Sequence, residues 1–277
     1  MKKILFSTFL IGCLVTANAQ AIKTPSPSTT TSVKQEFGLA AIDLSYSRPN
    51  MKGRKIFGDL VPYNAVWRTG ANSATTLTFG DDVTIGGTKI PAGKYGLLTI
   101  PGANEWTIII TKQLDVTSPA AYKQDQDVVR VKAKPEALPF AMETFTIMFG
   151  DVKANSIAVG LLWDKTYVEF PITTDVEAKV MAQIDQAMNK DNKPYFQSAM
   201  YYMETGKDLN KANEWFDKAI VQTPEGFWIY YQKANCLAKL GKKQDALAAS
   251  NKSMELAKAA KNDDYVALNT KLQSSLK

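Results

Sequence analysis

Apolar and polar residues alternate through residues 33–172, which is the period of an extended chain. In the stretch 39–47, Ile42, Leu44 and Tyr46 fall on one face, and the residues between them are polar. We expect strands over residues 39–47, 75–79, 82–90, 91–101, 105–111, 127–133, 143–150, 156–163 and 167–172, with Gly86-Gly87 as a hairpin turn. The pattern predicts an antiparallel β-sandwich or jelly-roll-like domain.

At residue 174 the period changes from two to about four. Val176, Val180, Ile184 and Met188 recur on one face of a helix expected over residues 174–190. The sequence "TDVE" places Thr174 three residues before Glu177, which is the spacing of a capping box.

From residue 193 the chain repeats with a period of 34 residues. Large and small apolar positions recur at this spacing: Phe196 with Tyr230, Met203 with Leu237, Ala212 with Ala246, and Ala219 with Ser253. Gly206 and Gly241 fall where each helix pair has to turn. The pattern is similar to tetratricopeptide repeats, and it predicts two units, 193–226 and 227–260, within an all-α domain of residues 173–277. Such stacked helices favour docking of a protein partner.

The N-terminus has the pattern of a signal peptide over residues 1–19. A positive "MKK" precedes an apolar run, and Ala17 and Ala19 occupy the small-residue positions before a cut. Residues 20–32 are rich in Pro, Ser and Thr and read as a spacer. We therefore expect an exported protein, periplasmic or extracellular, with no transmembrane span in the mature chain. The alternative is that the protein is anchored to a membrane by a lipid on Cys13.

The composition limits the kinds of site and partner that this chain can have. Histidine is absent, which removes the usual nucleophile activation and the common zinc, copper and iron ligand sets, so we expect no metal and no cofactor. The net charge of +6 is spread among interleaved acids, which does not favour nucleic-acid binding. After cleavage only Cys236 remains, in an apolar helical run, and we expect a buried thiol.

Three of the four arginines lie in "YSRPNMKGRKIFGDLVPYNAVWRTGAN", residues 46–72. This stretch, followed by "IPAGKYGLLTIP", "EWTIII" and "ETFTI", resembles a family of secreted bacterial proteins known as a domain of unknown function (number twenty-nine eleven). The resemblance covers roughly residues 37–172. It implies an exported β-rich domain, with which a helical repeat tail is compatible, and it implies no activity.

The arginine cluster has two readings from the residues alone. In the structural reading, Arg48, Arg54 and Arg68 donate to loop carbonyls, and carboxylates such as Asp59 or Glu143 complete the contacts. In the ligand reading, Arg48 and Glu143 face inward at the mouth of the sandwich. The candidate ligand-binding residues are Tyr46, Arg48, Arg54, Trp67, Arg68, Asn72 and Glu143.

An aromatic ring, a guanidinium and an amide together suit a small or polymeric ligand, such as a glycan or a carboxylated molecule. We therefore expect an exported, non-enzymatic envelope protein that binds such a ligand or serves as a scaffold. The alternative is a carboxylate-dependent hydrolase acting on glycans, which needs two carboxyls about 5–9.5 Å apart. Glu143 with Asp43 or Asp59 is the pair to consider, although the strand alternation places Asp43 on the face opposite Tyr46. Trp106 and Trp163 alternate with apolar residues and are expected in the core.

Overall fold

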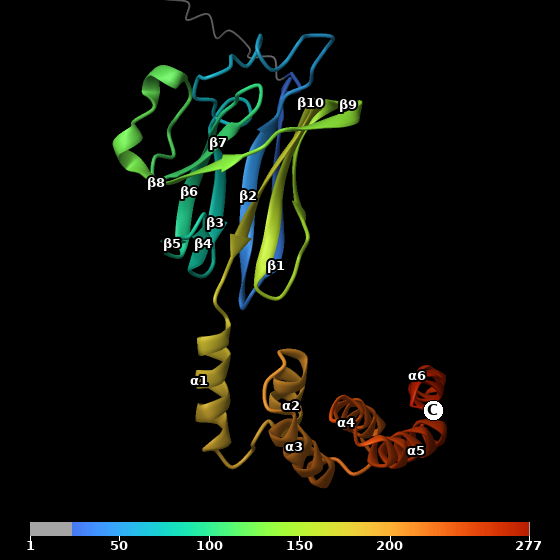
Figure 1. Ribbon diagram of the computed structural model, residues 1–277. Coiled ribbons are helices and arrows are strands. Elements are labelled where there is room, and N and C mark those ends of the chain that lie inside the picture. The colour runs from blue at the N-terminus through green and yellow to red at the C-terminus, as the bar shows by residue number, and fades with distance from the viewer. Residues whose placement is uncertain (1–23, 277) are drawn as a thin grey trace, which may run out of the picture. The chain divides into compact units, whose positions relative to one another are not determined.

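The computed structural model (Figure 1) describes residues 24–276 and divides the chain into two compact units. The first unit ends at Thr174 and contains the strands, and the second begins at Asp175 and contains the α-helices. A β domain followed by a helical repeat domain is the predicted fold class. No helix among residues 24–276 is long and apolar enough to cross a membrane.

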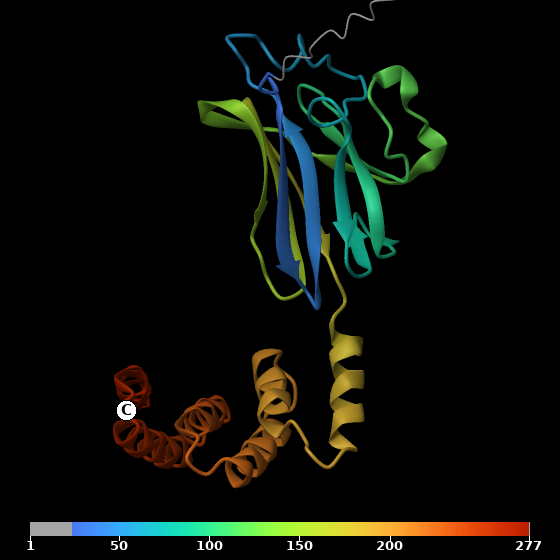
Figure 2. The ribbon, with the colours of Figure 1, turned by 180° about the vertical axis from the view of Figure 1, so that it is seen from behind.

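The first unit is built from two antiparallel sheets (Figures 1 and 2). The six-stranded sheet has the order β1-β2-β3-β6-β7-β8, and the four-stranded sheet has the order β5-β4-β10-β9. The strands are β1 (Thr29–Phe37), β2 (Ala40–Arg48), β3 (Thr75–Phe79), β4 (Val83–Ile85), β5 (Thr88–Ile90), β6 (Gly93–Ile100), β7 (Trp106–Thr111), β8 (Asp127–Ala133), β9 (Glu136–Gly150) and β10 (Ser156–Thr173). Two short 3₁₀ turns, η1 (Pro119–Ala121) and η2 (Gln124–Gln126), lie between β7 and β8.

The core of this unit contains the apolar residues that the alternation assigned to one face. Ile42, Leu44 and Tyr46 are all buried on β2, whereas Asp43 is exposed. Trp106 and Trp163 are also buried, as predicted. The two inner faces together form one apolar cluster that excludes water from the sandwich.

Strand β1 is not among the expected strands, and it begins inside the expected spacer 20–32. Its first four residues, TTTS, pair with the end of β2, from Thr29 opposite Arg48 onward. Threonine is polar but β-branched, so it suits an exposed edge strand although it carries no apolar signal. The expected signal peptide 1–19, including Cys13, lies outside the described residues.

Two expected strands, 156–163 and 167–172, form the single strand β10. Its pairing with β9 shifts register on both sides of Asp164, whose φ is 53°. Irregular pairing of this kind bends a strand without ending it. The β4–β5 hairpin turns at Gly86 and Gly87 with φ of 57° and 79°, the positive values that a two-residue turn requires.

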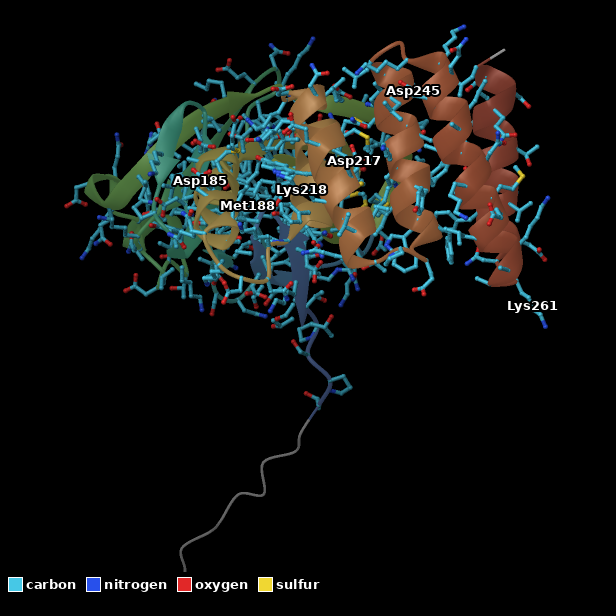
Figure 3. All side chains as sticks on the ribbon, turned by 90° about the horizontal axis from the view of Figure 1, so that it is seen from below. Asp185, Met188, Asp217, Lys218, Asp245 and Lys261 are labelled. Atoms are coloured by element: carbon cyan, nitrogen blue, oxygen red, sulfur yellow. The ribbon has the colours of Figure 1, made fainter. Side chains whose placement is uncertain are left out.

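The second unit contains the helices α1 (Glu177–Met188), α2 (Tyr195–Glu204), α3 (Leu209–Gln222), α4 (Phe227–Lys239), α5 (Lys243–Ala259) and α6 (Asp263–Ser275). The predicted repeats coincide with the pairs α2–α3 and α4–α5. The matched small positions Ala212 and Ala246 are fully buried, so neighbouring helices approach closely there. Figure 3 labels Asp217 on α3 and Asp245 in the first turn of α5.

The predicted capping box at the start of α1 is wrong. Thr174 Oγ1 donates to the carbonyl of Asp82 at 3.0 Å, which ties this hydroxyl to the β domain. The backbone N–H of Glu177 donates instead to Asp175 Oδ1 at 3.1 Å. Asp175 therefore satisfies an unpaired helix N–H, and Thr174 belongs to the end of the sandwich.

Candidate functional site

Residues 49–74 form the connection between β2 and β3, and we call them the roof segment. Phe145 N donates to Pro49 O at 2.9 Å, and Met51 N donates to Glu143 O at 2.8 Å, so the segment begins against β9 of one sheet. At Trp67 it forms a bridge with Thr99 of β6, in the other sheet. The roof segment therefore spans the open end of the sandwich, where Figures 1 and 2 show loops gathered.

A cavity of about 340 Å³, the roof cavity, lies in this region. Most of its wall comes from the roof segment, including both Arg54 and Arg68. Ser118 and Pro119 from the β7–β8 connection, Ser28 before β1 and Trp163 of β10 also line it. The volume is at the lower end of the range for small-molecule sites.

The roof cavity brings together three of the seven candidate residues, Arg54, Trp67 and Arg68. The other four, Tyr46, Arg48, Asn72 and Glu143, do not line it. Each of these four makes contacts that hold the end of the sandwich together.

Tyr46 and Arg48 connect β2 to β9. The buried Tyr46 hydroxyl accepts from Ile147 N at 2.9 Å and lies 3.3 Å from Ile147 O, to which it can donate. Arg48 donates through Nε to Phe145 O at 3.1 Å and through Nη2 to Thr146 Oγ1 at 2.8 Å. These bonds join the two sheets where their strands do not pair. The role of Arg48 is structural, but its acceptors lie on strand β9, whereas the structural reading expected them in a loop.

Glu143 is exposed, so the expectation that it faces inward at the mouth is wrong. Glu143 lies in the middle of β9, where the roof segment crosses this strand. Its Oε1 accepts from the backbone N of Lys52 at 2.9 Å, and it forms no ion pair with an arginine of the described chain. Asp59 is exposed as well, and the described chain contains no ion pair between Asp59 and an arginine. Within residues 24–276, carboxylates therefore do not complete the contacts of Arg48, Arg54 and Arg68.

Asn72 lies in a turn of the roof segment with a φ of 59°. Its Nδ2 donates to Ser28 O and to Ser47 Oγ, both at 3.2 Å. The amide thus ties the chain before β1 to the end of β2, and positive φ is a conformation that asparagine tolerates well.

Trp67 is 9% exposed and belongs to an aromatic cluster. Its ring stacks on Trp163 at 5.8 Å and meets Phe57, Trp106 and Phe145 edge to face. Its Nε1 donates to Gly70 O at 3.0 Å. The ring is packed in the core, and its low exposure leaves little area on which a sugar could stack.

Arg54 and Arg68 border the roof cavity in different ways. Arg54 is exposed and closes its own loop, donating through Nε to Met51 O at 2.8 Å and through Nη2 to Asn50 O at 2.6 Å. Arg68 donates through Nη1 to Thr117 O at 2.6 Å, and its Nε is buried with no acceptor. Neither guanidinium forms an ion pair with a carboxylate of residues 24–276.

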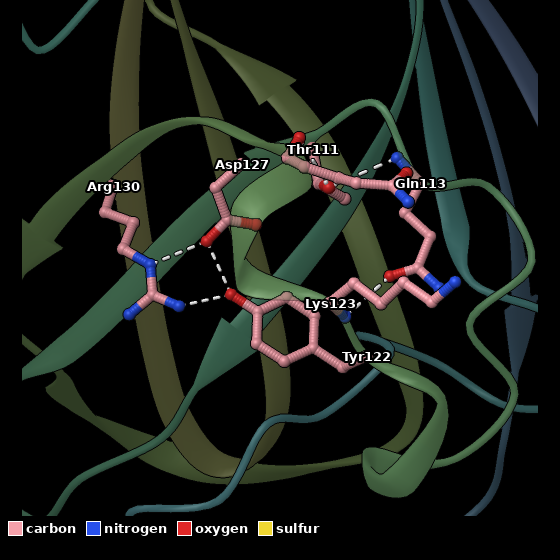
Figure 4. A network of polar contacts seen from close by, with 7 residues as sticks. Thr111, Gln113, Tyr122, Lys123, Asp127 and Arg130 are labelled. Atoms are coloured by element: carbon pink, nitrogen blue, oxygen red, sulfur yellow. Dashed lines mark hydrogen bonds and ion pairs between the residues drawn. The ribbon is translucent and has the colours of Figure 1, made fainter.

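The fourth arginine, Arg130, lies in a separate network (Figure 4). Its Nε donates to Asp127 Oδ2 at 2.7 Å, and its Nη2 contacts the hydroxyl of Tyr122. Burial, and then the hydrogen bond to Asp127, raise the pKa of Tyr122 to about 12. Gln113 holds the same connection by accepting from Lys123 N at 2.8 Å. Arg130 is thus a charge-paired arginine outside the roof cavity.

The part of the chain that the structure describes contains no group of three His, Cys, Asp or Glu residues placed to hold a metal ion. Cys236 is buried on α4, as its apolar surroundings predicted. Burial raises the pKa of its thiol, which keeps it protonated.

Comparison with protein families identifies the β domain. The profile of a family described as protein of unknown function (DUF2911) matches residues 26–172. The chain belongs to this family. The DUF2911 region begins before β1 and ends one residue before the end of β10, so it coincides with the sandwich and its roof, and the resemblance seen in the arginine-rich segment is confirmed. Comparison with curated proteins and with solved structures gives no match.

Sequence reasoning missed the residues that reach the cavity from outside the roof segment. Ser118 and Pro119 lie about 50 residues beyond Arg68 in the chain, and no motif links the two regions. The DUF2911 sandwich brings them together only because β7 and β6 are neighbours in the sheet. A signal that could have found them is the Ser-Pro turn after the apolar strand 105–111.

Proposed function

We propose that the protein is an exported, non-enzymatic binding protein of the cell envelope. Its β domain binds an anionic ligand in the roof cavity, and its helical repeats, which are similar to tetratricopeptide repeats, dock a protein partner.

One observation carries the ligand-binding part. Arg54 and Arg68 border the same cavity, and neither has a carboxylate partner within residues 24–276. Guanidinium groups beside apolar walls recognise anions strongly, because a charged hydrogen bond gains strength where water is excluded. A negatively charged group in the cavity would give both arginines the counter-charge that the described chain does not supply.

Binding of the unmodified protein to a panel of ligands tests this part. The panel contains neutral glycans, carboxylated glycans, phosphorylated sugars and amphiphilic carboxylates, each measured by calorimetry. We expect an anionic member to bind, and the double variant Arg54→Gln/Arg68→Gln to lose at least about tenfold in affinity. Arg130→Gln is the matched control, because it removes an arginine of the same domain outside the cavity. A panel without any binder, or full binding by the double variant, contradicts the proposal.

The partner-docking part is supported by aromatic side chains on α4 and α6. The ring centroids of Phe227 and Tyr231 on α4 lie 4.8 and 5.5 Å from the ring centroid of Tyr265 on α6. All three residues are partly exposed. Partly exposed aromatic clusters are common centres of protein interfaces. A photo-crosslinker at Tyr231 should capture a defined partner in cells, whereas one at Lys261 should not; equal capture at both positions contradicts the proposal.

Export is supported by the pattern of residues 1–19, and the cleavage site remains a proposal. Mass spectrometry of the mature protein should give an N-terminus at Gln20. A lipid-modified N-terminus at Cys13 would instead establish the membrane-anchored form.

A further inference from the structure

The four arginines differ in how they use one edge of the guanidinium group. This edge carries the Nε–H and one Nη2–H, which point in nearly the same direction and can bind two oxygens side by side. In Arg48, Arg54 and Arg130, both Nε and Nη2 contact oxygens of the protein.

Arg68 is the exception. It donates through Nη1 to Thr117 O, and no other hydrogen bond of its guanidinium is formed within residues 24–276. Its Nε is buried and has no acceptor, although an unmet buried donor is costly. Thr117 holds the group by the opposite edge, so the free edge is oriented by the protein and still unpaired.

We infer that the free edge of Arg68 binds the carboxylate of a small amphiphilic acid whose apolar body occupies the roof cavity. This inference rests on the proposed ligand-binding function and specifies its ligand. A carboxylate presents two oxygens in one plane, which match the two parallel N–H groups of a guanidinium edge. Arg54 adds positive charge at the same cavity but has both N–H groups of its edge bound to its own loop.

The walls of the cavity favour an apolar body over a sugar. They include Leu60, Val61, Pro62, Val66 and Pro119, and none of the lining residues within 24–276 is acidic. Among these described residues, Ser28 and Ser118 are the only ones on the wall with a hydroxyl side chain. A sugar needs a partner for most of its hydroxyls and usually an aromatic face, and the ring of Trp67 is already stacked on Trp163.

The experiment compares three probes on the full mature chain by calorimetry. Decanoate, below its micelle concentration, has the carboxylate and the apolar body; decan-1-ol lacks the charge, and glucuronate lacks the apolar body. We expect decanoate to bind at least about tenfold more tightly than either of the others. Equal affinity for decanoate and decan-1-ol, or tighter binding of glucuronate, would overturn the inference.

Two matched variants distinguish the contribution of the guanidinium edge to binding from the contribution of the positive charge. Arg68→Lys keeps the positive charge and removes the edge, and we expect a loss of at least about tenfold in decanoate affinity. Arg54→Lys makes the same change at the same cavity, where the edge is already used, and we expect a loss of no more than about threefold. An unchanged affinity in Arg68→Lys, or an equal loss in both variants, would overturn the assignment to Arg68.

Nuclear magnetic resonance of the unmodified protein gives a readout that does not depend on a variant folding. The chain has only four arginines, so four Nε–H signals are expected. The Arg68 signal should shift on addition of decanoate while the Arg130 signal stays in place; a shift of neither, or of both equally, overturns the inference. If an anionic glycan of the panel binds and decanoate does not, the proposed function stands and the inferred amphiphilic carboxylate ligand fails. If nothing in the panel binds, both fail.

Discussion

The two units complete their cores with different contacts. In the β domain, side-chain bonds close the open end across long stretches of chain: Tyr46 reaches Ile147, and Arg48 reaches Phe145. In the helical unit the corresponding buried polar bonds are closer in sequence, such as Asn269 Nδ2 with Ser253 Oγ at 2.8 Å. Helices satisfy their own backbone, so their side chains need only set the spacing between neighbours. Strands leave unpaired groups where a sheet ends, and long multi-donor side chains complete them.

The two units also differ in the sizes of their buried side chains. The β domain fills the space under its roof with aromatic rings, which include Trp67, Trp106 and Trp163. The repeats bury alanines and serines where their helices cross, such as Ala246 and Ser253. We therefore expect the β domain to be most sensitive to lost volume and the repeats to be most sensitive to added volume.

The largest expected effect is the removal of a ring under the roof. Trp163→Ala deletes a fully buried side chain that contacts Trp67, Phe57 and Phe145, and it should cost about 3–5 kcal/mol of β-domain stability. Trp228→Ala, which removes a partly exposed ring from α4, is the control and should cost about half as much. Urea unfolding is followed by a β-domain signal and, for the helical unit, by circular dichroism. In Trp163→Ala we expect the β-domain transition at a lower urea concentration and the helical transition unchanged. An equal shift of both transitions would show that the two units do not unfold separately.

Adding volume tests the repeats. Ala246→Leu places three extra carbons at a fully buried helix crossing and should cost about 1–3 kcal/mol. Ala248→Leu, on the same helix but exposed, should change stability by less than about 0.5 kcal/mol. Urea unfolding monitored by helix content measures both variants. Equal stabilities would mean that the α4–α5 crossing is not tightly packed.

Removing a hydroxyl tests the long-range ties. Tyr46→Phe leaves the buried N–H of Ile147 without its acceptor, and we expect a loss of about 1–3 kcal/mol. Tyr95→Phe is the control, because that hydroxyl donates only to Pro91 O, four residues away. Denaturant titration of the β-domain signal should separate the two variants. Similar losses of stability in both variants would indicate that the bond between the sheets contributes no more to stability than a local one.

The sequence predicts the regular parts of this protein better than its roof. Alternation identified the buried face of β2, and the period of 34 identified the helix pairs, because both arise from which positions lose contact with water. The alternation missed all of β1, which precedes the first expected strand and begins with TTTS, paired but polar. The sequence placed Arg54 and Arg68 in one candidate site but did not distinguish them. That difference depends on which loop carbonyl lies near each guanidinium, and loop geometry has no period.

A smaller effect separates Arg48 from Arg54. Arg48→Lys removes two bonds between β2 and β9 and should cost about 1–2 kcal/mol, because one ammonium cannot reproduce the planar pair. Arg54→Lys affects an exposed loop and should cost less than about 0.5 kcal/mol. Thermal unfolding of the two variants side by side provides the measurement. An equal cost would place both arginines in the same structural role.

The smallest effect concerns Tyr122 and tests how firmly the β7–β8 connection is held. Its pKa is raised to about 12, first by burial and then by the hydrogen bond to Asp127, so the folded state favours the neutral hydroxyl. The stability contributed by this group is complete below pH 10, the ordinary tyrosine value, and is lost as pH rises from 10 to about 12.

Asp127→Asn should lower the pKa of Tyr122 only partly, because burial is the larger cause. Tyrosinate absorbance across this range, with Tyr122→Phe to identify the signal, measures the change. Tyr167, whose raised pKa depends on burial and Glu169, should titrate as before. If Asp127→Asn leaves the Tyr122 titration unchanged, the carboxylate does not hold this hydroxyl. The connection that supplies Ser118 and Pro119 to the roof cavity, and Thr117 O to Arg68, is then held by its backbone turns, Gln113 and Arg130.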